Sequence, residues 1–92
     1  MTSFDSPVDG YMEKLMAEII NEEWDQAKTT LDRIQSEWTR RKPWISFNNT
    51  YTDIQDFERI LAQLNAYVNI QDKPGAAAQA ADLGDMWRRF AG

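Results

Sequence analysis

The feature that most constrains the fold of this chain is a heptad-like spacing of apolar residues, which recurs in four segments. In the clearest segment, the apolar residues alternate three and four positions apart: Trp24, Ala27, Leu31, Ile34 and Trp38. This spacing predicts one apolar stripe along an α-helix. The other three stripes are Val8, Met12, Leu15 and Ile19; then Ile54, Phe57, Leu61, Leu64 and Val68; and finally Ala76, Ala80, Leu83, Trp87 and Phe90.

The stripes predict an all-α fold of four antiparallel helices, arranged as two stacked αα-hairpins in a small bundle. We expect the helices at about residues 6–20, 23–42, 52–71 and 74–90. Because Asn21-Glu22-Glu23 is a short polar connection, it favours an antiparallel pair. With 92 residues, the chain is expected to form one domain over residues 1–92, with residues 1–5 disordered.

Local signals set the expected helix ends. Ser6 and Pro7 suit the cap and first position of the first helix. Thr52 begins a capping box and is expected to cap the third helix. Pro43 lacks a backbone donor and restricts the residue before it, so the second helix is expected to stop or bend there. Residues 43–51 are then an irregular connection between the hairpins.

A shift of 49 residues aligns the first half of the chain with the second. It places Val8 on Phe57, Leu31 on Ala80 and Trp38 on Trp87. One interpretation is a duplicated hairpin, as in helical repeat proteins. The other is that 49 residues are seven heptads, so helices of fixed phase align at this shift without duplication. Two stacked hairpins are expected under either interpretation.

The composition excludes several kinds of chemistry. The chain has no cysteine and no histidine, which removes thiolate nucleophiles and the commonest general base and metal ligand. No catalytic residue, cofactor or metal ligand is therefore predicted, and we expect the protein not to be an enzyme. A net charge of −5 disfavours binding to nucleic acid or to an anionic membrane. The longest apolar run, Ala76-Ala77-Ala78, is too short for direct membrane insertion.

Aromatic and charged residues have ordinary structural interpretations. Trp24, Trp38 and Trp87 lie on the stripes and are expected in the core, where a tryptophan usually finds one partner for its N–H. An acidic group is expected at one end of the bundle, solvated and without the spacing of a calcium loop: Glu18, Glu22, Glu23, Asp25 and Asp72. Basic residues 40–42 and 88–89 fall at predicted helix ends, where cations complement the helix dipole.

Several of these residues together resemble a known family. They are the acidic turn Asn21-Glu22-Glu23 with Trp24 and Ala27, then Trp38, then Arg41-Lys42 and Trp44, followed by the helix through Leu64. The pattern resembles an uncharacterised helical family of Gram-positive bacteria, catalogued as domain of unknown function 4363. The resemblance covers about residues 11–87 and implies an all-α bundle without an assigned activity. Members often carry an N-terminal membrane anchor and a histidine near the start of the third helix; here Thr50 or Tyr51 stands near that place. We expect either a cytoplasmic protein or a domain of an anchored one.

The expected function is a non-enzymatic protein-interaction or structural module. The alternative is a small-ligand binder with a cleft between the hairpins, lined near Trp44, Phe47 and Tyr51. A second apolar line, formed by Tyr11, Ile60 and Tyr67, widens the first and third helices. We expect this line to be buried between those two helices, with a weak homodimer as the alternative. The six residues named here are the predicted partner or ligand surface, and the partner's identity stays open.

Overall fold

The computed structural model describes residues 7–91 of the chain, and the side chains of residues 8–90 within them. It contains four helices: α1 (Pro7–Ile20), α2 (Trp24–Ser46), α3 (Tyr51–Asn69) and α4 (Lys73–Ala91). No strand occurs in this described part, so the predicted all-α fold class is confirmed. The expected Ser6 cap and the expected disorder of residues 1–5 lie outside the described residues.

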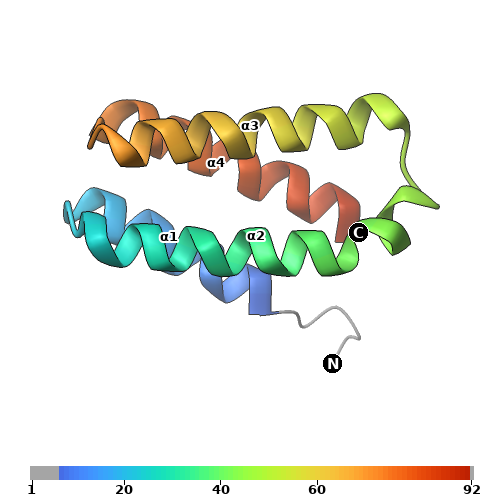
Figure 1. Cartoon of the computed structure of the whole chain (residues 1–92), viewed down its shortest axis with the longest axis horizontal. Helices are drawn as coiled ribbons and strands as arrows, with labels where there is room; N and C mark the ends of the chain where they lie inside the picture. The colour runs from blue at the N-terminus through green and yellow to red at the C-terminus, as the bar shows by residue number, and fades with distance from the viewer. Residues whose placement is uncertain (1–6, 92) are drawn as a thin grey trace.

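The helices form one bundle in which each helix packs on two neighbours. α1 packs on α2, α2 on α3, α3 on α4 and α4 on α1, so α1 and α3 stand diagonally opposite each other. In Figure 1, consecutive helices run in opposite directions along the bundle. The α1–α2 and α3–α4 turns lie at one end, and the α2–α3 connection lies at the other. The molecule measures 35 × 30 × 18 Å, with helices along its longest dimension.

The core is built from the predicted stripes. Every stripe residue is buried except Met12 and Phe90, which are partly buried and pack against the core. Trp24, Trp38 and Trp87 are all buried, which confirms their predicted core positions. Full burial of one large apolar side chain stabilises a fold by about 1.5–3 kcal/mol. The stripes are therefore the main source of stability in the bundle.

The two turns between paired helices have the same backbone geometry. Glu22 and Gln71 both have positive φ angles, 58° and 59°. In each turn the next residue donates its N–H to the carbonyl five positions earlier, from Glu23 to Glu18 and from Asp72 to Tyr67. This is the bonding of a Schellman helix end, which satisfies carbonyls of the last turn. The equivalent residues are 49 positions apart, as in the sequence comparison.

The second helix continues past Pro43, so the predicted stop at this residue is wrong. α2 ends at Ser46, so residues 43–46 are helical and the connection is only residues 47–50. The last turn of α2 is stabilised because the Ile45 side chain is buried in the core. Its carbonyl accepts hydrogen bonds from Asn48 N–H and from the Asn49 side-chain amide, each at 3.0 Å. Tertiary packing thus overcomes the local cost of the proline, about 3 kcal/mol in a helix interior.

The third helix begins earlier than predicted. Its cap is Thr50, not Thr52, and the Thr50 hydroxyl oxygen accepts a hydrogen bond from Asp53 N–H at 3.1 Å. Thr50 and Asp53 have the spacing of a threonine cap followed three residues later by an acid. Because two threonines compete in this stretch, the local pattern alone did not select between them.

Candidate functional site

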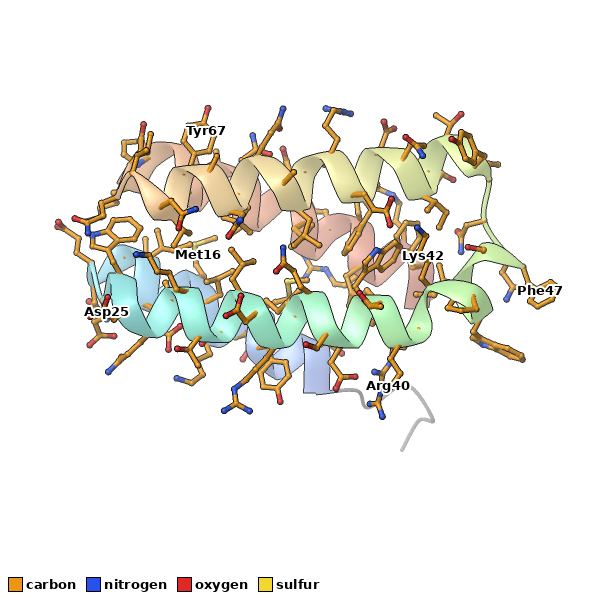
Figure 2. All side chains as sticks on the ribbon, in the orientation of Figure 1. Met16, Asp25, Arg40, Lys42, Phe47 and Tyr67 are labelled. Atoms are coloured by element: carbon orange, nitrogen blue, oxygen red, sulfur yellow. The ribbon has the colours of Figure 1, made fainter. Side chains whose placement is uncertain are left out.

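The most unusual surface of the bundle lies at the α2–α3 connection. Trp44, Phe47 and Tyr51 are 71%, 84% and 77% exposed. We call these three residues the aromatic end. Single exposed apolar residues are ordinary on protein surfaces, but three large aromatic residues within eight positions are typical of a contact surface. Figure 2 shows Phe47 pointing away from the bundle at this end.

The backbone that carries the aromatic end is held by specific hydrogen bonds. Trp44 belongs to the last turn of α2, and Phe47 is the C-cap residue, whose N–H bonds to the Trp44 carbonyl at 3.2 Å. Tyr51 is the first residue of α3 and follows the Thr50 cap. A binding surface carried by ordered backbone loses less conformational entropy on association than one carried by a flexible loop. The aromatic end is therefore preorganised for contact.

A buried aromatic cluster lies within the same end of the molecule. Trp38 and Phe57 have ring centroids 4.2 Å apart, and Phe90 lies 5.4 Å from Phe57 and 5.9 Å from Trp38. Trp87 is 6.3 Å from Phe57. Such pairs add stability beyond the area they bury. The cluster joins α2, α3 and α4, and so fixes the helix ends from which the exposed residues project.

One carboxylate connects this cluster to the surface. Glu58 Oε2 accepts a hydrogen bond from Trp38 Nε1 at 2.9 Å and forms an ion pair with Lys42 Nζ at 2.7 Å. The hydrogen bonds from Lys42 and Trp38 lower the pKa of Glu58 from its ordinary value of 4.5, although partial burial acts in the opposite direction. Trp38 thus has the predicted N–H partner. The indole N–H of Trp87 is buried without one among the described residues, contrary to the general expectation.

Several cations lie on the parts of α2 and α4 that lead to this end of the bundle. Arg40 and Arg41 both pair with Glu37, and Arg88 pairs with Asp85. Because α2 continues to Ser46, residues 40–42 do not lie in its last turn, and the prediction that they complement its helix dipole is wrong. Arg88 and Arg89 do lie in the last turn of α4. Arginine beside tryptophan and tyrosine is the composition typical of protein-binding hot spots.

The second apolar line occupies a different place from the one predicted. Tyr11, Ile60 and Tyr67 are partly buried against the core, but α1 and α3 are diagonal in the bundle, so the line is not stacked between them. Tyr67 instead lies on α4, because a Cβ added to Gly75 would meet its ring at 2.5 Å. In Figure 2, Tyr67 lies near the end opposite Phe47. The six predicted surface residues therefore do not form one surface.

The opposite end carries the acidic group. We call it the turn end, and it consists of Ile20 with the turn at residues 21–23 and of the turn at residues 70–72, which begins with Ile70. Glu18 is buried and bonded to Lys14 rather than solvated as predicted, and one of its oxygens has no partner among the described residues. Glu22 lies 3.8 Å from Lys73, and Asp72 accepts a hydrogen bond from Gly75 N–H. Within residues 8–90, no three acidic side chains are grouped to hold a metal ion.

The hollows described on the surface lie along the bundle and are lined mostly by residues with polar side chains. One of about 400 Å³ is bounded by Tyr11 and Lys14 of α1 and by Asp25, Thr29 and other polar residues of α2. A second hollow follows the exposed face of α2, and a third lies between that face and Tyr11 of α1. None of these three includes Trp44, Phe47 or Tyr51, whose large exposure is typical of a projecting surface rather than of a cleft. Along residues 7–91, no helix has the length and apolarity needed to cross a bilayer.

Three features of the two ends were missed by sequence reasoning. Glu58 was not singled out, because its partners come from another helix and no local pattern marks them. Ile20 and Ile70 are exposed at the turn end. Their signal was available, since each is an apolar residue beside a polar turn and outside its stripe.

Comparison with known proteins identifies a family but no activity. The family described as "Domain of unknown function (DUF4363)" matches residues 2–89. No curated protein and no solved structure matches the chain. The match covers nearly the whole bundle, including both ends.

Proposed function

The chain belongs to the DUF4363 family, and from this premise we propose that it is a non-enzymatic protein-interaction or structural module. Its contact surface is the aromatic end. The observation that carries the proposal is the exposure of Trp44, Phe47 and Tyr51 on hydrogen-bonded backbone. Exposed large aromatic residues gain most from being covered by another protein, because each removes roughly 150–250 Å² from water.

The charge of the molecule supports a protein as the partner. Half of the lysine and arginine residues lie around the aromatic end, at positions 40–42 and 88–89, but the chain as a whole has a net charge of −5. An acidic chain is repelled by the phosphate backbone and by anionic lipid. The cations around the aromatic end, several paired with acids, instead form a polar rim of the kind that surrounds protein interfaces.

The experiment compares partner capture by the wild type and a W44S/F47S variant. Both substituted side chains are exposed, so circular dichroism and the melting temperature are expected to stay unchanged. Proteins cross-linked to the wild type in extracts of the source organism should be lost with the variant. An A62S/A66S variant, altered on the exposed side of α3, is the control and should retain them. Equal capture by all three proteins contradicts the proposal.

A further inference from the structure

The large apolar side chains that are exposed within residues 8–90 all lie at the two ends of the bundle. Three form the aromatic end, and the other two, Ile20 and Ile70, are 48% and 69% exposed at the turn end. Along the long sides, the apolar residues larger than alanine are at least partly buried, and the exposed ones are alanines such as Ala62 and Ala66. The molecule therefore offers two apolar surfaces, separated by the length of the helices.

The two ends also differ in charge. Around Ile20 and Ile70 stand the carboxylates of Glu22, Glu23, Asp25 and Asp72, with Lys73 as the adjacent cation. At the other end, Glu37, Glu58 and Asp85 are paired with cations, while Asp53 beside Tyr51 has no ion pair among the described residues. Because five lysine and arginine residues also lie there, at positions 40–42 and 88–89, that end is less acidic than the turn end. Figure 2 shows Asp25 at one end and Arg40, Lys42 and Phe47 toward the other. Two turn ends would repel each other, whereas a turn end and an aromatic end attract.

We propose that copies of this chain associate head to tail, with the aromatic end of one copy covered by the turn end of the next. The proposal rests on the proposed function and names the occupant of its contact surface. Ile20 and Ile70 would pack on the aromatic residues, and Glu22, Glu23 and Asp25 would face the arginines of the neighbouring copy. Because the two surfaces differ, the contact is heterologous, and each added copy presents a new free end.

The size of the ends fits a weak association. The end face of the bundle is 30 × 18 Å. Covering three largely exposed aromatic side chains removes roughly 500 Å² of one copy from water, so the contact buries about 1,000 Å² in total. That area is at the lower limit for specific interfaces. The association is therefore concentration-dependent, and added salt should weaken it because the charged rim is exposed.

The test is sedimentation velocity of the whole chain from micromolar to millimolar concentration. The W44S/F47S variant blocks the aromatic end, and an I20S/I70S variant blocks the turn end. Each variant alone should weaken association by more than about tenfold. Their equimolar mixture should form a complex of two chains and no larger species, because one functional end remains on each variant. The A62S/A66S control should associate like the wild type.

The outcomes separate this inference from the proposed function. If the I20S/I70S variant still dimerises, the aromatic ends meet each other and the head-to-tail arrangement is wrong. If the wild type stays monomeric throughout, no second copy covers the aromatic end. In both cases the proposed function is tested separately, by the capture experiment: it is contradicted only if the W44S/F47S variant still captures the proteins that the wild type captures. A mixture that fails to form the two-chain complex also overturns the inference.

Discussion

Two tryptophans six residues apart in α2 have opposite environments. Trp38 is 4% exposed, packs on Phe57 and Phe90, and donates its N–H to Glu58. Trp44 lies nearly two helical turns further on and is mostly exposed. The same kind of side chain is therefore packed in the core at one position and exposed to solvent at the other.

Replacing each tryptophan by alanine should separate these roles. Trp38→Ala is expected to lower the free energy of unfolding by about 3–5 kcal/mol, because it removes a large buried aromatic side chain. That is a large part of the total expected for a chain of this size, roughly 5–14 kcal/mol. Trp44→Ala should change it by less than about 0.5 kcal/mol. Urea denaturation followed by circular dichroism measures both values. A loss below about 1 kcal/mol for Trp38→Ala would contradict the buried position.

The Glu58 carboxylate should make stability depend on pH. Because the pKa of Glu58 is lower in the folded chain than its ordinary value of 4.5, the ionised form is favoured by folding. The contribution of the ionised carboxylate to the free energy of unfolding is fully present above pH 4.5. It is lost as the pH falls through the lowered pKa of the folded state. Glu58→Gln should therefore be less stable than the wild type at neutral pH, and the difference should shrink in acid. Unfolding measured across pH tests this. A difference that is constant with pH contradicts it.

Two glycines that look alike in sequence differ in how closely another helix packs on them. Gly10 and Gly75 both lie in the first turn of a helix. Nothing lies within 4 Å of a Cβ built at Gly10, whereas at Gly75 such a Cβ would meet the ring of Tyr67. One glycine leaves open space, and the other allows α3 to pack on α4.

Alanine substitutions at these glycines should have opposite effects. Gly10→Ala should stabilise the protein by about 0.5–1 kcal/mol, because alanine loses less backbone entropy in a helix. Gly75→Ala should destabilise it by about 1–3 kcal/mol, because the Tyr67 ring must move. Thermal melting measures both changes. If the two variants shift stability in the same direction, the close packing of Tyr67 on Gly75 is wrong.

A glycine substitution should raise the stability of the fold by a similar amount in each of the two equivalent turns. Glu22 and Gln71 hold positive φ angles, which cost most residues about 1 kcal/mol and cost glycine very little. Glu22→Gly and Gln71→Gly should each raise stability by up to about 1 kcal/mol. Glu23, with a φ of −87°, is the matched control, and glycine there should lower stability. Equal gains at all three positions in melting experiments would argue against this account.

The bundle as a whole segregates surface chemistry along its length. Stripes from all four helices close the interior, and each helix packs on two neighbours. Within residues 8–90, the large apolar side chains that are exposed lie at the ends. The ends are therefore the surfaces that the proposed contacts would use.

Metal removal should leave the whole molecule unaffected. Without cysteine or histidine, a metal site would need oxygen ligands alone, which suit calcium or magnesium. We expect chelators to leave the melting temperature unchanged. A shift of several degrees that calcium reverses would instead identify a cation site at the turn end, around Glu22, Glu23 and Asp72.

Only part of the candidate site could be predicted from the sequence. Trp44, Phe47 and Tyr51 were singled out because they lie in an apolar stretch without a stripe. Their place on a projecting end depended on Pro43 remaining inside α2, which the burial of Ile45 decides. Glu58 was missed because its bonds to Trp38 and Lys42 cross between helices.

The sequence by itself determined the four amphipathic helices, because a spacing of three and four residues places residues such as Leu31 and Leu64 on one face of a helix whatever that face meets. The tertiary structure alone decided which helices became neighbours, and so placed Tyr67 on α4 rather than between α1 and α3. The physical reason is that periodicity is local, whereas burial depends on which other element occupies the same space.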